Sequence, residues 1–223
     1  MAETAAPRFP HVPLPIERDR LMLLMVAMNM GSTGLDVYLA HSIGTVQNAF
    51  MHIPILYAPL GVATAALLGL SPRRPPLLVW AHIAVMLMGI TVGIVGFAFH
   101  LRTVMLPSGE FIWGGLIFSA PVLAALAFSG ISGLGICAAI EEVSPGRYLL
   151  PGLLEVSVGL TKRQLYFQFI GFGVTAATIS AAIEHAQEGY LSWTMWLPVA
   201  IGGLCAGALI GHSLRREPPL GEL

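Results

Sequence analysis

Residues 71–100 have the sequence SPRRPPLLVWAHIAVMLMGITVGIVGFAFH, in which a turn rich in proline and arginine precedes a long apolar run. As an α-helix rising 1.5 Å per residue, the run at 77–99 extends over roughly 35 Å, enough to cross a hydrocarbon core of about 30 Å. Prolines clustered in this way are typical of a stop between two helices. The stretch therefore predicts a transmembrane helix that begins beside a positively charged turn.

Five further apolar runs lie on either side of it, at 21–40, 53–70, 112–139, 165–183 and 193–211. If the six runs cross a membrane one after another, ten of the eleven basic residues lie on one side of that membrane. Only Arg102 lies on the other side. Because lysine and arginine concentrate in cytoplasmic loops, both chain termini are expected in the cytoplasm. The predicted fold is an all-α bundle of six transmembrane helices, arranged as three consecutive helical hairpins.

The same pattern divides the chain into three parts. Residues 1–20 and 214–223 are expected to be cytoplasmic tails, and residues 21–213 to form the transmembrane bundle. Within the bundle, the segment 140–164 combines many leucines and valines with few charges, so it is expected to lie at the cytoplasmic interface. The first apolar run is expected to act as an uncleaved signal anchor, because no signal-peptide cleavage site precedes it.

Composition agrees with a membrane protein. The chain has 56% hydrophobic and 10% charged residues, whereas a soluble domain has about 25% charged residues. No basic stripe indicates nucleic-acid binding. The expected partners are the lipid bilayer and other membrane subunits. Arginine outnumbers lysine ten to one, and alanine and glycine are abundant, which points to a GC-rich bacterial genome and hence to a multi-pass protein of the bacterial inner membrane.

The predicted topology gathers four histidines at the outer, periplasmic boundary, together with nearby carboxylates. Imidazole and carboxylate groups suit a transition metal such as copper, zinc or iron. The sequence thus predicts a metal site at the periplasmic mouth of the bundle, serving redox or hydrolytic chemistry or metal handling. No fixed-spacing motif decides whether the protein is an enzyme. The expected ligands are His41, His52, His100 and His185, with Asp36 and Glu184 orienting or bridging them. The alternative is that each histidine is an ordinary interfacial residue.

The first apolar run carries unusual polar residues on one helical face. Asn29, Thr33, Asp36 and Ala40 follow the spacing of such a face. Because an aspartate facing lipid is costly, this face is expected to point into the bundle.

Three other functions remain open. The stripe His82, Met86, Gly89, Gly93, Gly96 and His100 resembles the way b-type cytochromes seat haem b between helices. On that interpretation the protein is a di-haem electron-transfer subunit with iron ligands among His82, His100, His185 and His212; otherwise the glycines only pack helices. A small carrier is less favoured, because no run carries the mid-span break typical of midplane transport sites. A non-catalytic scaffold subunit is the last alternative.

Overall fold

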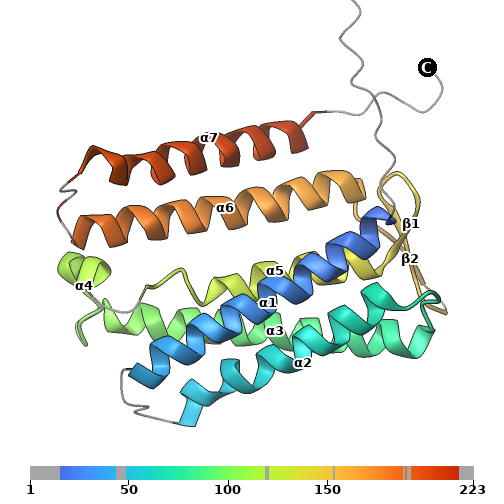
Figure 1. Cartoon of the computed structure of the whole chain (residues 1–223), viewed down its shortest axis with the longest axis horizontal. Helices are drawn as coiled ribbons and strands as arrows, with labels where there is room; N and C mark the ends of the chain where they lie inside the picture. The colour runs from blue at the N-terminus through green and yellow to red at the C-terminus, as the bar shows by residue number, and fades with distance from the viewer. Residues whose placement is uncertain are drawn as a thin grey trace, which may run out of the picture.

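The structure is a computed structural model that describes residues 16–43, 49–118, 121–152, 154–187, 189 and 192–215 (Figure 1). Most of the two predicted tails lies outside these residues. The chain is mostly helical, and five helical segments of the described residues are long and apolar enough to cross a membrane. They contain α1 (Arg18–Ile43), α2 (His52–Leu70), α3 (Pro76–Thr103), α6 (Lys162–Gln187) and α7 (Trp196–Ser213). The protein is therefore a multi-pass membrane protein.

The fourth predicted span, at 112–139, is not one continuous helix. It consists of α4 (Trp113–Phe118), only 6 residues long, and α5 (Leu126–Ala139), of 14 residues. At 1.5 Å per residue α5 covers roughly 21 Å, less than a hydrocarbon core of about 30 Å. Between the two helices, Ala124 N–H donates to Pro121 O at 3.2 Å, and Leu126 N–H donates to Leu123 O at 3.1 Å. These are tight three-residue turns beside Pro121, a residue with no N–H to continue a helix.

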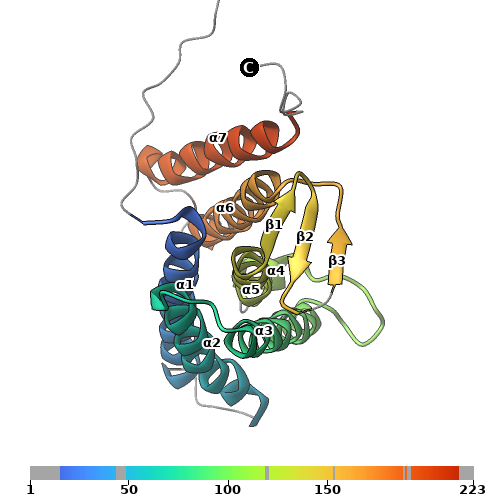
Figure 2. The same ribbon diagram turned by 90° about the vertical axis from the view of Figure 1, so that its right-hand side faces the viewer.

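The segment 140–164 corrects the all-α prediction. It contains a three-stranded antiparallel sheet in the order β1 (Glu141–Ser144), β2 (Arg147–Leu150) and β3 (Leu154–Ser157). Gly146 and Gly152 turn the chain between strands with φ of 75° and 97°, values that favour glycine. Figure 2 shows the sheet at one end of the helical bundle.

Tyr148 ties this sheet to the segment that leads into α6. Its side chain is buried, and its hydroxyl donates to Leu160 O at 2.7 Å. Burial, followed by the nearby Glu142 carboxylate, raises the pKa of Tyr148 above its usual range. The phenol therefore stays protonated and keeps donating this bond at any physiological pH.

The helices pack in pairs of chain neighbours: α1 with α2, α3 with α5, and α6 with α7. This is the hairpin pairing expected from the sequence, although the orientation of the helices in the membrane stays a prediction. The buried core lies among α1, α2, α3 and α5, with α6 closing one side. In Figure 2 α7 lies at the edge of the bundle beside α6.

The glycine stripe of α3 lies against α5. Gly89 faces Ser132, Gly93 faces Ser129, and Gly96 faces Ala125. The Ser129 hydroxyl also donates to Ile90 O across this contact at 2.9 Å. The glycines let the two helices approach closely, as small residues do in membrane proteins. Helix packing was the alternative role given to these glycines, beside a haem pocket.

Candidate functional site

The four outer histidines lie near helix ends on the same side of the bundle. His41 is near the end of α1, His52 begins α2, and His100 and His185 are near the ends of α3 and α6. Figure 1 shows these four ends on its left-hand side. We call this the outer end, because the basic residues predict that it faces the periplasm.

Two of these histidines are oriented by backbone carbonyl groups. His41 Nδ1 lies 3.0 Å from Met51 O, and His100 Nδ1 lies 2.9 Å from Pro121 O. Because a carbonyl oxygen only accepts hydrogen bonds, Nδ1 carries the proton in both rings. The neutral ring then has Nε2 as its acceptor, which is the nitrogen available to a metal ion or another donor.

The described residues do not assemble the predicted metal shell. No three histidine, cysteine, aspartate or glutamate side chains among them lie close enough together to hold one ion. His52 and Asp36 are exposed, and so is Asn29. The polar face of α1 was expected to point into the bundle, and this expectation is wrong. The polar face points away from the other helices, because Leu23, Val26 and Met30 form the buried face of α1. The metal site itself stays a prediction.

The inner histidines lie in separate helix contacts. His82 is fully buried, with Nδ1 3.3 Å from the Thr64 hydroxyl and Nε2 3.2 Å from Gly135 O. Both of its ring nitrogens thus have protein partners. His212 Nε2 instead accepts from the Arg163 guanidinium at 2.6 Å, and its ring packs edge-on against Phe167. His82 and His212 are thus held in different helix contacts, and the di-haem alternative stays a prediction.

A cavity of about 210 Å³ opens where the fourth span is interrupted. Its walls are mostly apolar, and its polar side chains are Ser180, Glu184 and Gln187 of α6. The Gln187 amide donates to Ile117 O, which ties the end of α6 to α4. Pro121, which also lines the cavity, accepts a hydrogen bond from His100 at its carbonyl oxygen. The remaining lining residues are Leu116, Pro121, Val122, Leu123 and Ile183. Of the predicted site residues, Glu184 thus lines this cavity and His100 bonds to Pro121 in its wall, while His41, His52 and Asp36 belong to α1 and α2.

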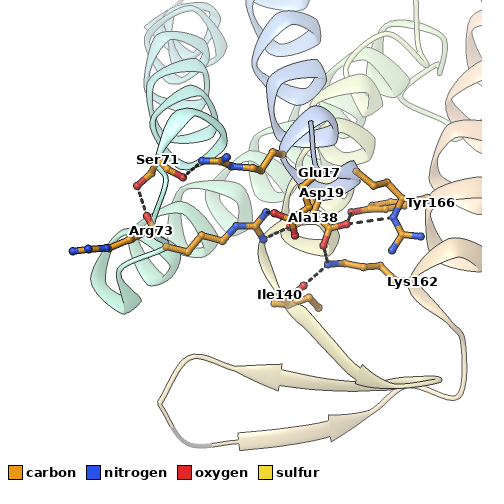
Figure 3. Close-up of polar contacts among 11 residues, drawn as sticks. Glu17, Asp19, Ser71, Arg73, Ala138, Ile140, Lys162 and Tyr166 are labelled. Atoms are coloured by element: carbon orange, nitrogen blue, oxygen red, sulfur yellow. Dashed lines mark hydrogen bonds and ion pairs between the residues drawn. The ribbon is translucent and has the colours of Figure 1, made fainter. Parts of the chain in front are cut away.

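An ionic cluster at the opposite, inner end was not predicted. The Lys162 side chain is only 1% exposed, and its ammonium lies 2.5 Å from Asp19 Oδ2 and donates to Ile140 O (Figure 3). The Tyr166 hydroxyl donates to Asp19 Oδ1 at 2.8 Å. The Glu142 carboxylate accepts from the backbone N–H of Lys162 at 3.0 Å. The cluster joins the start of α1, the start of the sheet and the start of α6.

In the sequence, Lys162 was only one of the basic residues that predict the membrane topology, and Asp19 had no predicted role. A sequence signal for the cavity did exist: Pro121 lies inside an apolar run, where proline interrupts helix hydrogen bonding. Comparison of the chain with protein-family models, with curated proteins and with solved structures found no match.

Proposed function

We propose that this membrane protein binds a small organic cation at its outer end, in the cavity between the interrupted fourth span and α6. The observation that carries the proposal is the Glu184 carboxylate, which lines a mostly apolar cavity where the apolar run at 112–139 is interrupted between α4 and α5. Interrupted helices form the binding sites of many transporters, and ionisable residues in membrane helices mark paths for substrates and ions. Binding of this kind is the first step of a small carrier.

The chemistry of the lining favours an amine over a bare metal ion. The Glu184 carboxylate supplies a negative charge, and the Gln187 side chain supplies an amide beside it. Leu116, Val122 and Ile183 supply apolar walls for an alkyl group. The cavity volume of about 210 Å³ lies below the roughly 300–1,000 Å³ of drug-sized pockets. An alkylammonium ion of a few carbons fits this space, whereas a single ion would leave most of it unfilled.

Replacement of Glu184 by glutamine is expected to weaken amine binding at least about tenfold. A hydrogen bond to a charged group contributes about 1.5–3 kcal/mol, and about 1.4 kcal/mol corresponds to a factor of ten. The measurement is calorimetric titration of the purified protein in lipid nanodiscs with n-butylammonium. Tetrabutylammonium, which is too large for the cavity, is expected not to bind.

The matched control is Glu110→Gln. Glu110 is an exposed carboxylate in the loop between α3 and α4, and it is not among the residues lining the cavity. This variant is expected to bind n-butylammonium as the unmodified protein does. Equal affinities for Glu184→Gln, Glu110→Gln and the unmodified protein would exclude the proposed site.

A second candidate is the metal site proposed from the sequence, and one observation favours it. The Nδ1–carbonyl bonds of His41 and His100 are the type of contact that orients ligand histidines in metal proteins. For one ion to bind both rings together with His185, the outer helix ends would have to move closer together.

The metal proposal predicts that the outer histidines act as a unit. If His41, His100 and His185 ligate one ion, each single alanine variant loses most of the bound metal, and a second substitution adds little, because ligands of one centre are strongly coupled. Elemental analysis of the purified variants measures this, with His82→Ala as the inner-end comparison. Metal content that stays unchanged in all three outer variants would rule the site out.

A further inference from the structure

The outward face of α1 carries polar residues that nothing in the described chain covers. Asn29, Ser32 and Asp36 are all exposed, although α1 is long and apolar enough to span the membrane. Met25 and Leu39, 41% and 48% exposed, extend this row in both directions. We call these five residues the α1 stripe. A lone monomer would present an aspartate and an asparagine to lipid, which is costly.

The spacing of the α1 stripe identifies the kind of surface that covers it. Positions 25, 29, 32, 36 and 39 are separated alternately by four and three residues. This is the 3.5-residue repeat by which two helices pack side by side with a small crossing angle of about 20°. The α1 stripe is thus shaped for another membrane-spanning helix rather than for lipid chains.

We propose that this helix is α1 of a second copy of the chain, and that the protein is a dimer paired through the α1 stripe. All copies share one orientation in the membrane, so a two-fold axis along the membrane normal brings identical residues together at identical depths. Any other partner would need its own polar groups at the same three depths. A second copy has them by necessity.

The polar groups of the α1 stripe are complementary to themselves. The Asn29 amide donates one hydrogen to Met25 O of its own helix at 2.9 Å. Its second hydrogen and its carbonyl oxygen can pair with the same groups of the other copy. Two Asp36 carboxyl groups would likewise face each other at one depth, where a carboxyl O–H of one copy can donate to a carboxyl oxygen of the other. Hydrogen bonds of this type hold membrane helices together.

The dimer does not depend on cation binding, since the cavity is lined by α4, the turn at 121–123 and α6 rather than by α1. Its test is disulfide cross-linking in lipid bilayers at high dilution, with Cys137 and Cys205 first replaced by alanine. Cysteines introduced at Met25 or Leu39 are expected to give cross-linked dimers on mild oxidation. Thr91→Cys is the control, because Thr91 is also exposed but lies on α3. Equal cross-linking at position 91 and at the two α1 positions would overturn the proposal.

A second measurement uses the polar residues themselves, with the dimer fraction determined by single-molecule photobleaching. Asn29→Leu is expected to lower the dimer fraction at least fivefold at a fixed protein-to-lipid ratio. Thr91→Leu is the matched control, because the Thr91 hydroxyl also bonds only to its own helix, at Leu87 O. Asp36→Asn should keep the dimer, since paired amides replace paired carboxyls. If the unmodified protein is monomeric, or if Asn29→Leu and Thr91→Leu behave alike, a second copy does not cover the α1 stripe.

Discussion

Replacement of Lys162 by methionine is expected to lower the free energy of unfolding by at least about 3 kcal/mol. Removing one partner of a buried ion pair costs about 3–5 kcal/mol, because the other charge is left without compensation. Here that charge is Asp19, which would keep only the hydroxyl of Tyr166 and the exposed Arg18 guanidinium as partners. Unfolding in mixed detergent micelles, titrated with sodium dodecyl sulfate, measures the difference.

The exposed pair Arg147–Glu155 provides the control. Its N–O distance is 2.8 Å, but both side chains are largely exposed, at 57% and 42%. Exposed pairs contribute about 0–1 kcal/mol, so Arg147→Met should change the stability little. The double variant Lys162→Met with Asp19→Asn should recover part of the loss. A Lys162→Met protein as stable as Arg147→Met would mean that the cluster does not hold α1 and α6 together.

Gly89→Ala is expected to have the second largest effect on stability. A Cβ at position 89 would fall well inside contact distance of the Tyr57 hydroxyl and the Ser132 hydroxyl. These two groups are themselves bonded at 3.1 Å within the core. Overpacking of a close-packed core costs about 1–3 kcal/mol, and here it would also break the Tyr57–Ser132 bond. The expected result is a clear fall in unfolding temperature in detergent.

Gly130→Ala on α5 is the matched substitution, because a Cβ there meets no atom within 4 Å. It should leave the unfolding temperature unchanged or slightly raised. Removal of both hydroxyls, by Tyr57→Phe and Ser132→Ala, should relieve part of the strain in the Gly89→Ala protein. A Gly89→Ala protein that unfolds like Gly130→Ala would contradict the close approach of α3 to α5.

The spans were predictable because hydropathy is summed over many residues. The runs at 53–70 and 77–99 lie within α2 and α3, and 165–183 lies within α6. The interruption of the fourth span was missed because α4, the turns and α5 are all apolar, and hydropathy does not register a lost hydrogen bond. The Pro–Gly pairs at 145–146 and 151–152 are typical of turns and could have predicted the strands between them. The segment was instead expected to lie along the interface as one unit.

The candidate site was harder to predict, because it depends on which faces of neighbouring helices meet. Sequence spacing correctly placed Asn29 and Asp36 on one face of α1, but it could not say whether that face meets the protein or the surroundings. Glu184 and His100 lie near the ends of α6 and α3. The cavity that Glu184 lines, and the bond from His100 to its wall, depend on the turn at Pro121, which no periodicity reports.

The clamp between Asp19 and Lys162 constrains the order in which the chain assembles. The two residues are 143 positions apart. At a synthesis rate of about 5–20 residues per second, roughly 7–30 s pass between the emergence of Asp19 and that of Lys162 from the ribosome. During this interval the Asp19 carboxylate has no Lys162 to pair with, so we expect it to stay hydrated at the membrane surface. The arrival of α6 then fixes it in place, so the last hairpin to be made completes the inner end of the bundle.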